Sequence, residues 1–193
     1  MRSCRPRSRS RSAVSTDLLL AALAAHADAG GEPALAAAFA DFARAHADGF
    51  ERSCRPGHFT GSAWLVSADG RRVLLTHHRK LGRWLQLGGH ADGDPDLAAV
   101  ALREAEEESG LSDLTVEAPI FDLDRHWIPA RGDEPGHWHY DVRYVVRATA
   151  SEDFAVGPES LALAWRDIAT LAADRDADAS LGRMAARWLA RIG

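Results

Sequence analysis

The sequence predicts one mixed α/β domain with a small helical hairpin in front of it. Apolar residues recur at helical spacing up to about residue 50, and short apolar runs of strand length follow from about residue 57. A length of 193 residues suits one domain of ordinary size. Apolar residues make up 46% of the chain, which is enough for a buried core.

Composition excludes several classes of protein. The longest uninterrupted apolar run, residues 18–25, is far shorter than the roughly 20 residues of a membrane span, so we expect no membrane partner. The formal net charge is −5, and the first sixteen residues carry five Arg and no acid, so the rest of the chain is more acidic than this total. An acidic body argues against specific binding of nucleic acid. Two cysteines, Cys4 and Cys54, are too few for a disulfide framework and favour a reducing cytoplasm.

The chain before the domain divides into a tail and a hairpin. Residues 1–16 alternate Arg and Ser, which predicts a disordered tail. Residues 17–50 predict two helices, because Asp17 is a capping residue before an Ala/Leu run. Gly30 interrupts this run, Pro33 opens a second one, and Gly49 ends it.

The elements of the domain follow in order from residue 57. Asp69–Gly70 between two apolar runs predicts a β-hairpin of residues 63–66 and 73–76. Further elements are expected as a strand at 84–87, a helix at 96–109 closed by Gly110, strands at 114–123, 138–148 and 162–165, and helices at 167–172 and 180–192. The strands at 114–123 and 138–148 enclose a Gly/Pro-rich loop at 129–137.

The helix at 96–109 carries a group of acidic residues at informative spacing. Glu104, Glu107 and Glu108 are related by three and four positions, so they share one helix face. Like charges at these spacings repel, and a hard divalent cation such as Mg²⁺ would compensate them. The alternative interpretation is a solvated acidic face, which is common on helices.

Residues 89–111 bear a specific resemblance. Gly89, a spacer of thirteen residues and the run REAEEESGL at 103–111 resemble the Nudix box, with flanking similarity in HHRKLGRWLQLGGH and HYDVRYVVRA. The resemblance covers about residues 57–190 and implies a Nudix-like α/β/α sandwich with a mixed sheet. The chain departs from the box at Pro95, where the family has its first Glu. Acidic residues flank this position at Asp92, Asp94 and Asp96.

The resemblance implies a function and a set of site residues. Nudix enzymes hydrolyse a nucleoside diphosphate linked to another group, so the expected partner is a small nucleotide-type substrate. The box implies that Glu104, Glu107 and Glu108, with the carbonyl of Gly88, hold Mg²⁺ or Mn²⁺. The resemblance then implies Glu104, Glu107 and Arg103 as the catalytic residues. The role of Arg103 would be to orient the carboxylates by charge-assisted hydrogen bonds. The general base stays open among Glu104, which we favour, and the alternatives Glu134, Glu159 and His126.

Other residues have competing interpretations. Arg79 and Lys80 could contact phosphate or belong to a solvated turn, and Trp127 could stack on a base or pack in the core. A group formed by His126, His137, His139 and Asp141 resembles a second metal site. A strand with alternating exposed polar residues explains His137, His139 and Asp141 equally well.

Two rival functions keep the same fold. Pro95 would suit a ligand-sensing module that has lost catalysis, although retention of three mutually repelling glutamates argues against it. An isomerase of the isopentenyl diphosphate type would need a cysteine in the site, and neither Cys4 nor Cys54 is well placed for that role. The sequence leaves both the substrate and a homodimer open.

Overall fold

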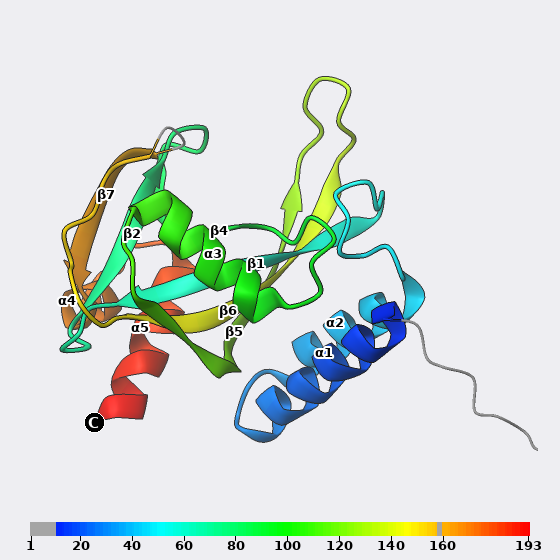
Figure 1. Cartoon of the computed structure of the whole chain (residues 1–193), viewed down its shortest axis with the longest axis horizontal. Coiled ribbons are helices and arrows are strands. Elements are labelled where there is room, and N and C mark those ends of the chain that lie inside the picture. The colour runs from blue at the N-terminus through cyan, green and yellow to red at the C-terminus, as the bar shows by residue number, and fades with distance from the viewer. Residues whose placement is uncertain (1–10, 158–159) are drawn as a thin grey trace, which may run out of the picture.

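The structure is a computed structural model that describes residues 11–157 and 160–193. These residues form five helices and one mixed sheet, and Figure 1 shows their arrangement. Along the chain the elements are α1 (Arg11–Asp28), α2 (Pro33–Ala45), β1 (Gly57–Val66), β2 (Arg72–His78), β3 (Arg83–Leu85), β4 (Leu87–His90), α3 (Leu97–Ser109), β5 (Leu114–Ile128), β6 (His137–Ala148), β7 (Ser160–Asp167), α4 (Ile168–Ala173) and α5 (Ala179–Ile192).

Most predicted elements are confirmed, but several boundaries differ. Strand β1 begins at Gly57 and not at residue 63, and the strand predicted at 84–87 is two short strands, β3 and β4. Helix α1 begins at Arg11, so residues 11–16 are helical and do not belong to a disordered tail, while residues 1–10 lie outside the described part. Strand β5 continues to Ile128, five residues past the predicted end at residue 123. The extension pairs with the start of β6, and cross-strand pairing can hold a polar segment in a strand that apolar patterning does not mark.

The sheet of the described residues has seven strands and is mixed. Its order is β3-β2-β1-β6-β5, with β4 pairing to β1 and β7 pairing to β2. Strands β1 and β6 run parallel, from Gly57 beside Trp138 to Val66 beside Arg147, and the other pairs are antiparallel. Every residue of β1 is buried, which fits a central strand that is covered on both faces.

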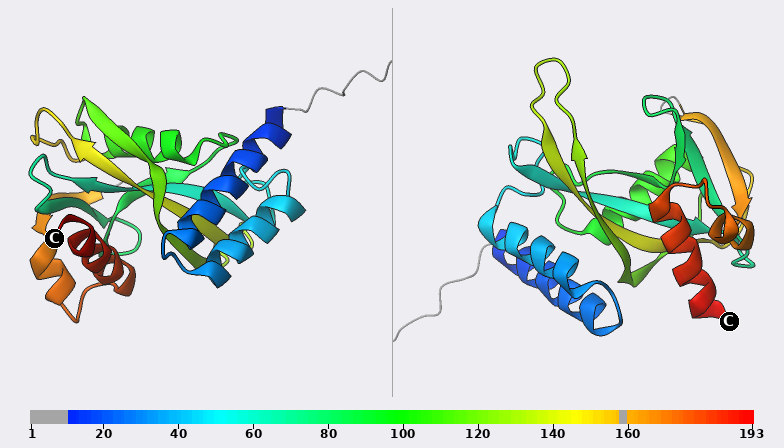
Figure 2. Two further views of the ribbon diagram at one scale, coloured as in Figure 1. Left: turned by 90° about the horizontal axis from the view of Figure 1, so that it is seen from below. Right: turned by 180° about the vertical axis from the view of Figure 1, so that it is seen from behind.

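Helices cover both faces of the sheet and divide the core in two. Figure 2 shows α3 and α5 on opposite sides of the sheet. One apolar cluster joins α1, α2 and α3 to one face, and it includes Phe59, Leu65 and Val142. The other joins α4 and α5 to the opposite face through Trp64 and Trp188. The result is the predicted α/β/α sandwich, with two helices preceding the sheet.

The α1–α2 pair is attached to the sheet by aromatic and polar contacts. The ring of Phe42 stacks on Tyr140 of β6 with 4.0 Å between centroids, and Phe39 meets the same ring edge-on at 5.2 Å. Nδ1 of His26 donates to the carbonyl of Ile120 at 3.1 Å, since a carbonyl can only accept.

Among the helices of residues 11–157 and 160–193, none combines the length and the apolar character of a membrane span.

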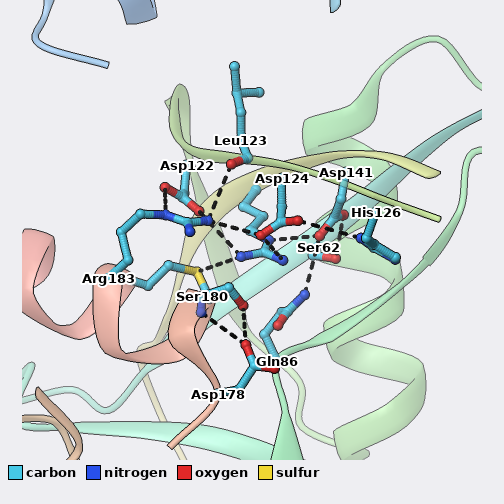
Figure 3. A network of polar contacts seen from close by, with 12 residues as sticks. Ser62, Gln86, Asp122, Leu123, Asp124, His126, Asp141, Asp178, Ser180 and Arg183 are labelled. Atoms are coloured by element: carbon cyan, nitrogen blue, oxygen red, sulfur yellow. Dashed lines mark hydrogen bonds and ion pairs between the residues drawn. The ribbon is translucent and has the colours of Figure 1, made fainter. Parts of the chain in front are cut away.

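A buried ionic network lies on the α5 side of the sheet (Figure 3). Arg143 of β6 has only 3% of its side chain exposed and donates to Asp141 at 2.7 Å and to Asp122 at 3.3 Å. Arg183 of α5 donates to Asp122 at 2.7 Å and to Asp124 at 3.0 Å. The network therefore connects β5, β6 and α5 by charge-assisted hydrogen bonds.

Loss of the Arg143 charge should destabilise the fold strongly. Arg143→Met leaves buried carboxylates without their cation, and we expect a loss of about 3–5 kcal/mol in the free energy of unfolding. Chemical denaturation measures this value. The matched control is Arg44→Met, because Arg44 pairs with Asp41 on the surface and should contribute less than about 1 kcal/mol. Equal losses in both variants would contradict the assigned role.

The same network should make stability depend on acid pH. Burial raises the pKa of Asp124, but hydrogen bonds from His126 and Arg183 and the charge of Arg143 hold it well below its usual value. A depressed folded pKa stabilises the protein above the unfolded pKa, and this stabilisation is lost as pH falls. We expect the free energy of unfolding to fall between about pH 5 and about pH 2, and to fall less steeply in Asp124→Asn. Denaturant titrations at several pH values measure this. If the free energy of unfolding falls in parallel in the wild type and in Asp124→Asn, the assigned role of Asp124 is wrong.

Candidate functional site

Helix α3 is fixed at both ends and pressed onto the sheet. The Asp96 side chain accepts from the backbone N–H of Ala99 at 3.0 Å and caps the first turn. Gly110 ends the helix at φ 69°, the left-handed conformation that glycine adopts without strain. A Cβ atom on Gly61 of β1 would lie 2.8 Å from the carbonyl oxygen of Leu97, so glycine lets the helix approach the strand. This close contact fixes where the acidic face of α3 lies.

The Glu104 carboxylate lies in space that is free because residue 89 is a glycine without a side chain. The carboxylate lies so close to Gly89 of β4 that a Cβ atom there would clash with it. Nη2 of Arg103 lies 3.4 Å from the Glu104 carboxylate and also 3.4 Å from the carbonyl of His90. Burial raises the pKa of Glu104, which Arg103 opposes and Glu107 reinforces.

The other acidic side chains of α3 differ in exposure. Glu107 and Glu106 are exposed, and Glu108 is half-buried. The described residues include two groups of three side chains whose ligating atoms all lie within 4.8 Å, and Glu104, Glu107 and Glu108 are not one of them. The three carboxylates share a helix face by their spacing, but mutual repulsion favours separated rotamers.

The donor set fits a hard divalent cation. Carboxylate oxygens and a backbone carbonyl are the ligands that Mg²⁺ prefers. Gly88 stands directly before Gly89 in β4, and a Cβ atom on Gly88 would clash with Ser62 of β1. Both glycines therefore allow the β4 backbone to lie close to neighbouring side chains. The metal roles of Glu104, Glu107, Glu108 and Gly88 stay predictions.

The loop around Pro95 is supported by the acids that flank it. Asp94 lies 3.8 Å from the Arg103 guanidinium and accepts from the N–H of Asp96 at 3.0 Å. Asp92 accepts from Nη2 of Arg52 at 2.7 Å. Asp94 thus supplies a carboxylate to Arg103 at the place where Pro95 replaces the glutamate of the box.

The predicted substrate-binding residues do not come together. Arg79 and Lys80 lie in the exposed turn after β2, where Nη2 of Arg79 donates to the carbonyl of Ser160 at 3.0 Å. Trp127 lies on β5 with 50% of its surface exposed, and its ring meets Trp138 edge-on at 5.3 Å. Two strands separate β2 from β5 in the sheet, and Figure 1 shows their ends well apart. The roles of Arg79, Lys80 and Trp127 in binding substrate stay predictions, and the three residues could not contact the same group.

The remaining base candidates lie at different places. Glu134 is exposed in the turn between β5 and β6, and Nδ1 of His126 lies 3.6 Å from Asp124. Glu159 lies outside the described residues. Cys54, the residue that the isomerase rival would need, is 2% exposed in the apolar cluster near α2, where burial raises the pKa of its thiol.

Two cavities lie away from α3. One of about 210 Å³ is bounded by α1, β5 and α5, beside Asp122 and Arg187. One of about 480 Å³ lies between the β2–β3 region and α4–α5, and its lining includes His77 and Trp84. Neither is lined by the acids of α3.

A group of histidines forms a second polar centre that the sequence predicted only in part. His137 and His139 belong to it, but Asp141 is engaged with Arg143 instead. His58 of β1 and His90 of β4 complete the group, with rings 5.0 Å apart. Sequence reasoning missed both, because pairing between distant strands brings them together. Burial and the neighbouring histidines lower the pKa of His58 to about 4 and of His139 to about 2.

The sandwich and the acidic helix beside a double glycine define a class of fold, and comparison with known proteins identifies the family. The family model described as NUDIX domain matches residues 58–188, and the chain belongs to this family. It is therefore a Nudix-type hydrolase acting on phosphoric anhydride bonds. No curated protein matches.

Solved structures of the same fold are distant in sequence. An Ap4A hydrolase of C. elegans in a binary complex has a TM-score of 0.55 and 17% identity, with 69% of this chain and 96% of that chain covered. The E. coli dihydroneopterin triphosphate pyrophosphohydrolase has a TM-score of 0.56 and 17% identity, over 69% and 95%. A Nudix hydrolase of M. smegmatis, RenU, has a TM-score of 0.51 and 20% identity, over 70% and 88%.

The contact between Gly89 and Glu104 can be tested. Gly89→Ala places a methyl group where the Glu104 carboxylate lies, and the flexible side chain must move away. We expect Mg²⁺-dependent hydrolysis to fall by about tenfold or more while the melting temperature changes little. Gly182→Ala in α5 is the control, because nothing lies within 4 Å of its added Cβ. Full activity of the Gly89 variant would show that the carboxylate position does not matter.

Proposed function

We propose that this chain is a divalent-metal-dependent pyrophosphohydrolase that cleaves a diphosphate linkage in a nucleotide or nucleoside diphosphate derivative. The observation that carries the proposal is the Glu104 carboxylate held against Gly89, on a helix face that also presents Glu107 and Glu108. Membership of the Nudix family supports the same reaction class.

The residues of the site have different proposed roles in metal binding, positioning and proton transfer. Glu104, Glu107, Glu108 and the carbonyl of Gly88 would hold Mg²⁺ or Mn²⁺, and a bound ion would neutralise the diphosphate and lower the pKa of the attacking water. Arg103 fixes the Glu104 carboxylate through its contacts to Glu104 and to the β4 backbone. Glu104 is our first choice as general base, and burial raises the pKa of its carboxyl group.

Two positions are proposed for binding the substrate. Arg79 and Lys80 offer positive charge for phosphate oxygens in the turn after β2, and the exposed ring of Trp127 offers a stacking surface for a base. They lie too far apart in the sheet order to contact one small group, so they would serve different parts of an extended molecule.

The alternative function is a catalytically impaired sensing module. Pro95 favours it, because the first Glu of the box is missing. Against it, Asp94 lies 3.8 Å from Arg103 and supplies a carboxylate from the neighbouring position. The isomerase rival is disfavoured by the burial of Cys54 in the apolar cluster.

The deciding experiment compares two glutamates of α3. The wild type, Glu107→Gln and the control Glu106→Gln are assayed for phosphate release from (d)NTPs and nucleoside diphosphate-linked compounds, with Mg²⁺ or Mn²⁺. We expect Glu107→Gln to lose about 100-fold or more of the activity, since even indirect supports of a metal cost 10–100-fold, and Glu106→Gln to keep it.

Three outcomes are informative. Metal-dependent turnover that only the Glu107 substitution removes establishes the hydrolase and ranks its substrates. Equal activity in both variants would contradict the metal role of Glu107. A folded wild type that binds Mg²⁺ and turns over no compound would favour the sensing module.

A further inference from the structure

Five of the nine histidines lie at one end of the sheet, on its α5 side. In the strand register His58 of β1 lies beside His139 of β6, which lies beside His126 of β5. His90 of β4 pairs with Thr60, two residues along β1 from His58. Residues two apart in a strand share a face, so His137 joins the same face as His139. The topology thus gathers imidazoles from four strands at one place.

The geometry of three of them suits a metal ion. The ligating nitrogens of His58, His90 and His139 all lie within 4.8 Å of one another. A tetrahedral zinc site with Zn–N distances of about 2.0–2.1 Å places its nitrogens about 3.4 Å apart. Nε2 of His137 and Nε2 of His139 already lie 3.2 Å apart.

His58 provides an observation independent of this spacing. Its side chain is 2% exposed, and both ring nitrogens are buried without a hydrogen-bond partner. Buried polar atoms are nearly always satisfied, so an imidazole with neither nitrogen bonded needs an explanation. A cation among the rings would satisfy one of the two nitrogens directly.

His137 has the orientation of a metal ligand. Its Nδ1 donates to the carbonyl of Pro135 at 2.9 Å, because a carbonyl can only accept. A neutral ring protonated at Nδ1 presents a lone pair at Nε2, which accepts a hydrogen bond from Nε2 of His139 and would be free for a metal ion once His139 gives up that proton. Histidines that bind metals commonly donate their other N–H to a carbonyl in this way.

We propose that His58, His90 and His139, with His137 in the fourth position, bind a Zn²⁺-type transition-metal ion at a site separate from the acidic face of α3. Imidazole ligands suit zinc and its first-row neighbours, whereas Mg²⁺ takes oxygen. Asp141 adds no oxygen ligand, since Thr60, Ser62 and Arg143 all donate to it. The site adjoins the hydrolase site, because the carbonyl of His90 lies 3.4 Å from Arg103.

The test is metal binding by the full chain, without an activity assay. Protein freed of metal by a chelator is titrated with Co²⁺, whose visible spectrum reports tetrahedral nitrogen coordination, and then with Zn²⁺ in competition. The titration is run in millimolar Mg²⁺, which occupies the carboxylates of α3, and we expect one tetrahedrally coordinated ion per chain that this Mg²⁺ does not displace. His58→Ala and His139→Gln should each weaken binding by about 100-fold or more.

Three controls separate this site from others. His77→Ala changes a histidine of β2 outside the group and should bind as the wild type does. Glu107→Gln should also bind normally, so failure of the hydrolase proposal would leave this one standing. Circular dichroism checks that each variant is folded, and the half-buried His139 offers a milder change than His58. A wild type that gives no tetrahedral Co²⁺ spectrum would overturn the proposal. So would Co²⁺ binding that is lost in His77→Ala or Glu107→Gln but kept in His139→Gln.

Discussion

The ion pair between Asp141 and Arg143 is the constraint on which the arrangement of the molecule depends. Both side chains are almost fully buried, at 2% and 3% exposed, and lie 2.7 Å apart. A buried charge is tolerated only when its hydrogen-bonding capacity is met. Asp141 accepts from Thr60 and Ser62 of β1, and Arg143 reaches Asp122 of β5. The pair thereby fixes three strands relative to one another.

Both polar centres take their positions from this constraint. Ser62, held by Asp141, lies against Gly88 of β4, and the next residue, Gly89, is where the Glu104 carboxylate lies. On the other side of the network, the register that places Thr60 beside Asp141 also places His58 beside His139. The acidic helix and the histidine group therefore depend on the same alignment of β1, β4 and β6.

The sequence predicts the parts of this structure that are encoded locally. The cap at Asp96, the glutamate spacing on α3 and the end at Gly110 can be read because helical geometry relates residues three and four apart. The grouping of His58 with His90 could not be read, since it depends on the register between strands distant in sequence. The burial of Arg143 could not be predicted either, because a charged residue in a strand ordinarily indicates a solvent-facing position.

The alternation of side chains along β4 separates two kinds of ligand atom. Gly89 borders the carboxylates of α3, and the very next residue, His90, projects among imidazoles on the opposite side of the strand. One extended strand thus acts as a partition between oxygen donors and nitrogen donors. A deletion of a single residue in β4 would exchange the two sides at once. A substitution can therefore alter one set of donors by itself, whereas a change in the length of β4 would alter both.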